Sequence, residues 1–200
     1  MSWMPPLRIG LWNAWIPMLY FPLHPLIMLA IHKTVGTGDL FKKMGAVPYD
    51  KSEQRAFVTY MAILVLMLVY SVFIPLRLGT AWFYAGVLIY LLGLGILLAA
   101  IVSNAATPVD RPFTSGAYRF SRHPMFVAIT MANIGISLAA ASWILLLLSL
   151  VVQGLQISQA NAEERGCAAR YGDEYRQYMS RTHRWLGAPR QPGGQPFPKG

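Results

Sequence analysis

Charged side chains are scarce in this chain, because only 12% of its 200 residues are Asp, Glu, Lys or Arg. A soluble domain carries about twice that fraction. Hydrophobic residues make up 55% of the chain, and they stand in long blocks instead of being dispersed. The composition therefore favours a single helical membrane domain over one or two soluble domains.

Cysteine and the common cofactor-binding motifs are also missing or nearly so. The single cysteine, Cys167, excludes an internal disulfide and a cysteine-rich metal site. There is no G-x-G-x-x-G, P-loop, H-E-x-x-H or C-x-x-C, so a nucleotide-binding sheet, a phosphate-binding loop and a zinc site are unsupported. The net charge of +9 is spread between and after the hydrophobic blocks, so we expect no nucleic-acid partner.

Five hydrophobic blocks of roughly 17–22 residues are each long enough to cross a hydrocarbon core of about 30 Å. The first contains three prolines, so we expect it to be kinked, and it is too long for a cleaved signal peptide. We predict an all-α, polytopic membrane helix bundle with spans at Leu11–Ile31, Ala56–Leu76, Ala81–Val102, Met125–Ala141 and Trp143–Gln159.

The basic residues alternate with the blocks and predict an orientation. With five spans, one side of the membrane carries two of the 17 basic residues, and the other carries fifteen together with all eight acidic residues. The positive-inside rule then places the N-terminus outside and the C-terminus in the cytoplasm. Four or six spans would break this alternation.

The turn between the fourth and fifth blocks, residues 139–142, is only a few small residues long, so these helices must form a tight antiparallel hairpin. In the predicted orientation its open end faces the cytoplasm. His123 begins one leg there, and Glu163 and Glu164 end the other. Charges at the ends of membrane helices are costly unless they are paired or functional. We therefore predict that the imidazole and the two carboxylates share one wet cleft at the inner leaflet.

Polar residues follow one face of the fifth block, since Gln153, Gln156, Gln159 and Glu163 recur at spacings of three and four. Such a stripe either joins helices by hydrogen bonds or forms a polar path into a site at Glu163. Asn133 on the fourth block is expected to face the same cavity.

A second, short helix is expected after the fifth block. Gly172 suits a left-handed helix stop, and Asp173 can cap a cytoplasmic helix over residues 173–184. Tyr171, Tyr175 and Tyr178 form a stripe that is more typical of packing than of a ligand cage. We divide the chain into a single membrane domain, residues 1–186, and a disordered tail rich in Pro and Gly, residues 187–200.

A pocket that combines carboxylates, a histidine, arginines and aromatic faces suits a cationic or zwitterionic ligand. Carboxylates hold a ribose diol or an ammonium, Arg or His holds a carboxylate, and aromatic faces attract a sulfonium. Gly116 and Gly135 would permit close approach of the backbone. S-adenosylmethionine has all these parts, which makes it one candidate ligand.

A two-part pattern makes the comparison more specific. The first part is Gly116-x-Tyr118-Arg119-x-x-Arg122-His123-Pro124-Met125-Phe126, and the second comprises Glu163-Glu164, Tyr171-Gly172-x-x-Tyr175-x-x-Tyr178 and Arg184-Trp185-Leu186. Over residues 80–186 the chain resembles the isoprenylcysteine carboxyl methyltransferase family, whose superfamily includes the phospholipid methyltransferases.

The resemblance implies an integral membrane methyltransferase that binds S-adenosylmethionine near the cytoplasmic helix ends and releases S-adenosylhomocysteine. The chain departs from the family pattern at Cys167, Thr182 and Gly187, which look like packing positions. Residues 1–80 carry no part of the signature, and we expect them to select the acceptor. The implied cofactor contacts are Tyr118, Arg122, His123, Pro124, Glu163 and Glu164, with Arg184 and Tyr175 completing the pocket.

The expected mechanism is direct methyl transfer, which requires no metal. Arg122 or Arg184 would orient a carboxylate acceptor, whereas Glu164 or His123 would take the proton from an amine or a thiol. Two simpler interpretations stay open. His123 would only cap the helix that starts at Pro124, and the glutamates would be ordinary interfacial charges, although Glu at a helix end opposes the helix dipole.

Other classes of protein also stay open. One is a nicotinamide-dependent membrane reductase related to sterol reductases, and another is a non-catalytic membrane scaffold. The expected partners are a lipophilic small molecule or lipid as acceptor and the surrounding membrane lipids, with no obligate protein partner.

Overall fold

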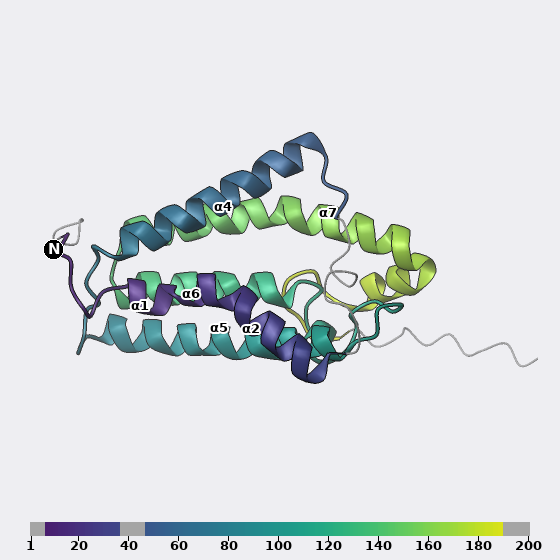
Figure 1. Cartoon of the computed structure of the whole chain (residues 1–200), viewed down its shortest axis with the longest axis horizontal. Coiled ribbons are helices and arrows are strands. Elements are labelled where there is room, and N and C mark those ends of the chain that lie inside the picture. The colour runs from purple at the N-terminus through teal and green to yellow at the C-terminus, as the bar shows by residue number, and fades with distance from the viewer. Residues whose placement is uncertain (1–6, 37–46, 190–200) are drawn as a thin grey trace, which may run out of the picture.

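A computed structural model describes residues 7–36 and 47–189, and these two ranges contain helices and no strands. In Figure 1, α4 lies along α7 on one side of the bundle, and α1, α2, α5 and α6 lie on the other. The predicted all-α class is confirmed. The elements are α1 (Trp15–Met18), α2 (Tyr20–Val35), α4 (Lys51–Ser71), α5 (Ala81–Ala106), the 3-10 helix η1 (Gly116–Arg119), α6 (Pro124–Ala139) and α7 (Trp143–Arg181).

Within the described ranges, four helical stretches are long and apolar enough to cross a membrane: Trp15–Val35, α4, α5 and α7. The helix α6 has 16 residues, so it is about 24 Å long at 1.5 Å per residue. It is apolar but shorter than the fourth span that we predicted. The bundle thus has four to five helices suited to a membrane, and its orientation stays a prediction.

The first span was predicted at 11–31, but the helical stretch runs from Trp15 to Val35. The residues before it form a turn and pair with the loop after α4, where Asn13 makes an isolated bridge with Pro75. The amide of Arg8 donates to the carbonyl of Phe73 at 2.9 Å, and the amide of Leu76 donates to the carbonyl of Trp12 at 3.0 Å. This pairing keeps the start of the hydrophobic block out of the helix.

The second span was predicted at 56–76, whereas α4 spans Lys51–Ser71. It starts early because of a capping box. The carboxylate of Asp50 accepts hydrogen bonds from the amides of Ser52 and Glu53, both at 2.8 Å. The Glu53 side chain in turn accepts from the Asp50 amide at 3.0 Å. The helix stops early because the following residues form the pairing just described.

The remaining three predicted ends also move. The helix α5 runs to Ala106, α6 stops at Ala139, and α7 continues to Arg181 instead of ending at Gln159. The long helix α7 is broken as predicted at Gly172, whose φ of 55° is left-handed. The short helix that follows ends at Arg181, three residues before the expected end. Residues 190–200 of the predicted disordered tail lie outside the described residues.

The hairpin of α6 and α7 is confirmed (Figure 1). Its turn passes through Ala141 with φ 47°, and the Ser142 hydroxyl caps α7 by accepting from the Leu145 amide at 3.4 Å. The close approach expected at Gly135 is also present. A Cβ there would lie 2.6 Å from the Tyr90 amide nitrogen of α5. This contact joins α5 to the C-terminal half of α6.

The polar stripe of α7 mainly joins helices. The Thr130 hydroxyl of α6 contacts the side-chain oxygens of Gln153 and Gln156, the latter at 3.1 Å. Asn133 is fully buried and accepts a hydrogen bond from the Tyr20 hydroxyl of α2 at 2.7 Å. These contacts favour the helix-packing alternative, and the expectation that Asn133 faces a cavity shared with Glu163 stays a prediction.

Candidate active site

His123 immediately precedes α6, but its side chain does not cap the helix. It is the N-cap residue, yet its side chain makes no capping hydrogen bond, and Pro124 follows as the first helical residue. The imidazole instead points toward α7, with Nδ1 3.1 Å from Glu163 Oε2 and Nε2 3.1 Å from Glu164 Oε1. The capping interpretation of this side chain is therefore wrong, and the predicted meeting of the imidazole with both carboxylates is confirmed.

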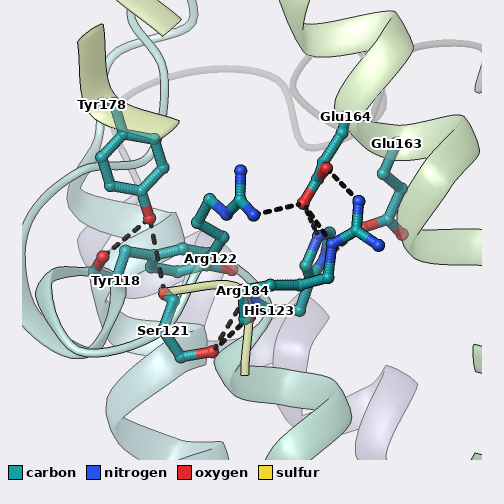
Figure 2. Close-up of polar contacts among 8 residues, drawn as sticks. All are labelled: Tyr118, Ser121, Arg122, His123, Glu163, Glu164, Tyr178 and Arg184. Atoms are coloured by element: carbon teal, nitrogen blue, oxygen red, sulfur yellow. Dashed lines mark hydrogen bonds and ion pairs between the residues drawn. The ribbon is translucent and has the colours of Figure 1, made fainter. Parts of the chain in front are cut away.

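Two arginines from different loops also reach Glu164 (Figure 2). The Arg184 guanidinium forms a bidentate pair, with Nε 3.0 Å from Oε1 and Nη2 2.5 Å from Oε2. Arg122 approaches Oε1 to 3.4 Å through Nη2. The carboxylate of Glu164 thus has three cationic or hydrogen-bonding partners, and the side chain is 11% exposed. The cluster is a closed ion-pair network, so Glu164 is not free in a wet cleft as we expected.

Glu163 is the more open of the two carboxylates. Its side chain is 37% exposed, and the one hydrogen bond to its carboxylate from the described residues is that of His123 on Oε2. Another unused polar atom belongs to Arg122, whose buried Nε has no hydrogen-bond partner in the described part of the chain. The network can therefore take a polar ligand at two atoms, the second carboxylate oxygen of Glu163 and the Nε of Arg122.

A seam between two loops holds this network together. The amide of Arg122 donates to the carbonyl of His183 at 2.9 Å, and the amide of Gly187 donates to the carbonyl of Phe120 at 3.0 Å. Between them, the Ser121 hydroxyl donates to the carbonyl of Arg184 at 3.1 Å. The loop that follows α7 is therefore fixed beside the start of α6, which brings Arg184 to Glu164.

Burial alone would lower the pKa of His123, but its hydrogen bonds to Glu163 and Glu164 outweigh burial and raise the pKa above 6.5. The first stretch of about 20 residues of α7 suffices to cross a hydrocarbon core. Glu164 follows this stretch and therefore lies outside the membrane-spanning part of the helix. Burial acts to raise the pKa of Glu164, yet the hydrogen bonds from His123 and Arg184 hold it at about 2. The carboxyl of Glu164 is therefore ionised at neutral pH, and the raised pKa of His123 favours its charged form. A carboxylate with this pKa is a weak base, which argues against Glu164 as a proton acceptor.

The raised pKa of His123 predicts a dependence of stability on pH. Its charge stabilises the fold fully below the unfolded value of 6.5, and this stabilisation is lost as the pH rises through the higher folded pKa. The melting temperatures of the wild type and of His123→Gln should therefore differ most in mildly acidic buffer and converge at alkaline pH. A difference that stays constant from pH 6 to pH 9, roughly the range in which histidine titrates, would contradict this pairing.

The other predicted site residues lie beside the network. Tyr118 is buried, and its carbonyl accepts from the Tyr178 hydroxyl at 2.7 Å (Figure 2). Tyr175 is also buried, and its ring centre lies 5.7 Å from that of Tyr178. The structure thus brings Arg122, His123, Glu163, Glu164 and Arg184 together, while the two tyrosines support them from an aromatic cluster.

Several residues around the site were not assigned a role from the sequence. The Phe126 ring stacks on His123 at 5.3 Å between centres, and Trp185 lies 6.1 Å from it. The Ser121 hydroxyl also accepts a hydrogen bond from the His123 amide at 3.0 Å. Phe126 and Trp185 stood inside the quoted motif, but nothing in their spacing indicated a stack on the imidazole.

Residues at and just before the start of α4 also lie near the site, although they stand outside the family signature. Arg165 of α7 binds both carboxylate oxygens of Glu53, at 2.8 and 2.6 Å. Because Arg165 directly follows Glu164, this pair anchors the start of α4 beside the network. Burial, followed by the charges of Glu163 and Glu53, raises the pKa of the nearby Tyr49 to about 12. Tyr49 and Glu53 thus lie near the network, and the expectation that residues 1–80 select the acceptor stays a prediction.

The helices and this network define a membrane protein with a cluster of charged side chains at the ends of its last helices. The family model of phospholipid methyltransferases matches residues 103–174. The predicted resemblance to this superfamily of membrane methyltransferases is confirmed by that match, which spans the residues from the end of α5 past the break in α7. No curated protein matches the chain. The match supports a membrane methyltransferase. Two of the predicted site residues, Tyr175 and Arg184, lie beyond the matched segment.

Proposed function

We propose that this protein transfers a methyl group from S-adenosylmethionine to a lipophilic acceptor at the cytoplasmic face of the membrane. The observation that carries the proposal is the convergence of His123 and Arg122 on Glu164, with Glu163 at the other imidazole nitrogen, inside the segment that matches the methyltransferase family. S-adenosylmethionine supplies an electrophilic methyl group when it is bound.

The unused polar atoms of the network fit this cofactor. The free oxygen of Glu163 can accept from a ribose hydroxyl or an ammonium group, and the buried Nε of Arg122 can donate to a carboxylate. Glu164 keeps both arginines and the imidazole in position. We assign it a positioning role, because its own oxygens are engaged by the protein.

The acceptor is a carboxylate, an amine or a thiol on an apolar molecule. A carboxylate needs no proton acceptor, whereas an amine or a thiol must lose a proton. The raised pKa of His123 favours its charged form, which cannot take a proton, and Glu164 is a weak base. For those acceptors the remaining candidate is Glu163, which is partly exposed and has one partner. Arg184 is 32% exposed and is the arginine better placed to meet an incoming carboxylate.

Ligand binding separates this function from the two alternatives. We expect calorimetry on the purified protein in nanodiscs to detect S-adenosylhomocysteine binding with a micromolar Kd and to detect no binding of NADPH. Glu163→Gln should remove this binding, because a neutral amide no longer favours a cationic or hydroxyl-rich ligand. Asp173→Asn is the matched control, since Asp173 is a solvent-exposed carboxylate on the same helix. Binding of NADPH alone would favour the reductase, and binding of neither ligand would favour the scaffold.

A further inference from the structure

A groove of about 760 Å³ lies along α5, next to η1 and the start of α6. Three small residues of α5, Gly95, Ala99 and Ser103, line it at spacings of four, so they share one face of the helix. Large apolar side chains stand at its sides, among them Val102, which is 43% exposed, and Phe120, which is 52% exposed.

The groove offers almost no polar group to an occupant. The hydroxyl of Ser103 donates to the carbonyl of Ala99 at 2.7 Å and accepts from the amide of Ala117 at 3.3 Å. It is therefore satisfied within the protein. Nothing lies within 4 Å of the Cβ that a side chain at Gly95 would carry, so the space above this residue is open. Because α5 is one of the helices suited to cross a membrane, hydrocarbon is the medium that this surface meets.

One end of the groove adjoins the active site. Ser121 and Pro124, the chain neighbours on either side of Arg122 and His123, line that end, and Leu186 lies there two residues after Arg184. The Ser121 hydroxyl bonds to the main chain of both His123 and Arg184. An amphiphile whose chain lies in the groove would therefore carry its polar head to the loops that hold the ion-pair network.

We propose that this groove binds the hydrocarbon chain of the acceptor and so selects long-chain substrates. The proposal rests on the proposed methyl transfer, because it assigns the occupant as the acceptor of that reaction. It adds a specificity-determining surface on α5, formed by Gly95 and Ala99, which belong neither to the implied cofactor contacts nor to the ion-pair network.

Filling the groove is the direct test. Gly95→Phe places a ring in open space, and Gly154→Phe is the matched control. Gly154 is also an exposed helical glycine with nothing within 4 Å of its Cβ, but it lies on α7 and does not line the groove. Ala99→Leu is a second groove-filling variant, which serves if Gly95→Phe does not fold. The probe is a 16-carbon alkylamine with a diazirine near the end of the chain, used with the protein in nanodiscs.

We expect light-induced labelling of groove residues to fall about tenfold in Gly95→Phe, because the ring excludes about two methylene groups of the probe. Labelling should not change in Gly154→Phe, and S-adenosylhomocysteine binding should be unchanged in both variants. Unchanged labelling in Gly95→Phe, or an equal fall in the control, would overturn the proposal by showing only non-specific contact with bilayer lipid.

This readout is independent of turnover, so the two proposals can fail separately. If labelling falls as expected but no methyl transfer occurs to any acceptor, the chain-binding groove stands and the proposed function fails. If methyl transfer occurs and Gly95→Phe methylates long-chain and short-chain acceptors with the same kcat/KM ratio as the wild type, the groove assignment fails while the function stands.

Discussion

Replacing Glu164 with glutamine is expected to destabilise the protein by about 3–5 kcal/mol, the cost of leaving buried charges without their partner. The Glu164 side chain is 11% exposed and faces Arg122, Arg184 and the imidazole of His123. An amide keeps one acceptor oxygen but removes the charge that holds these three groups together. S-adenosylhomocysteine binding should be lost as well, because the two arginines and the imidazole would separate.

Thermal unfolding in detergent, followed by tryptophan fluorescence, measures this effect. Glu174→Gln is the control, since Glu174 is an exposed carboxylate farther along α7, and its melting temperature should match that of the wild type. If Glu164→Gln melted at the wild-type temperature and still bound S-adenosylhomocysteine, the ion-pair network would not organise the site.

Gly86→Ala is expected to be the most damaging single-methyl substitution in α5. The added Cβ would lie 2.3 Å from the Ala139 amide nitrogen and 2.5 Å from the Gly135 carbonyl oxygen. Both atoms belong to the backbone of α6, so neither can move aside as a side chain would. Overpacking of this kind costs about 1–3 kcal/mol and at times more. The displaced α6 would also carry His123 away from α7.

Gly95→Ala provides a matched comparison in the same helix, because its Cβ would meet nothing within 4 Å. Alanine is favoured over glycine in a helix by about 0.5–1 kcal/mol, so Gly95→Ala should be neutral or slightly stabilising. Gly86→Ala should therefore lower the melting temperature, whereas Gly95→Ala should leave it unchanged or raise it slightly. Equal changes would show that α5 and α6 are not in backbone contact at Gly86.

The hairpin of α6 and α7 was predictable because a short turn of small residues leaves two consecutive helices only one arrangement. The meeting of His123 with Glu163 and Glu164 follows from that topology and from their places at the hairpin's open end. The break at Gly172 was predictable for a local reason, since glycine readily adopts the left-handed conformation found there.

The features that the sequence did not reveal depend on partners distant in the chain. Pairing between residues 8–14 and 72–76 sets the start of the first span and the end of the second. Hydrophobicity does not encode that pairing. The bidentate pair of Arg165 with Glu53 joins residues 112 positions apart. The stripe through Gln153 and Gln156 was compatible with a path or with packing, and only the contact with Thr130 separates the two.

Transfer of a labelled methyl group from S-adenosylmethionine into a lipid extract is the most direct test of the site, with the wild type and Glu163→Gln compared in nanodiscs. We predict that the wild type transfers label to the chloroform-soluble fraction and that folded Glu163→Gln transfers none. Equal incorporation by the two proteins would contradict the assignment of the reaction to this cluster. No incorporation by the wild type with any lipid or thiol acceptor would contradict methyl transfer itself.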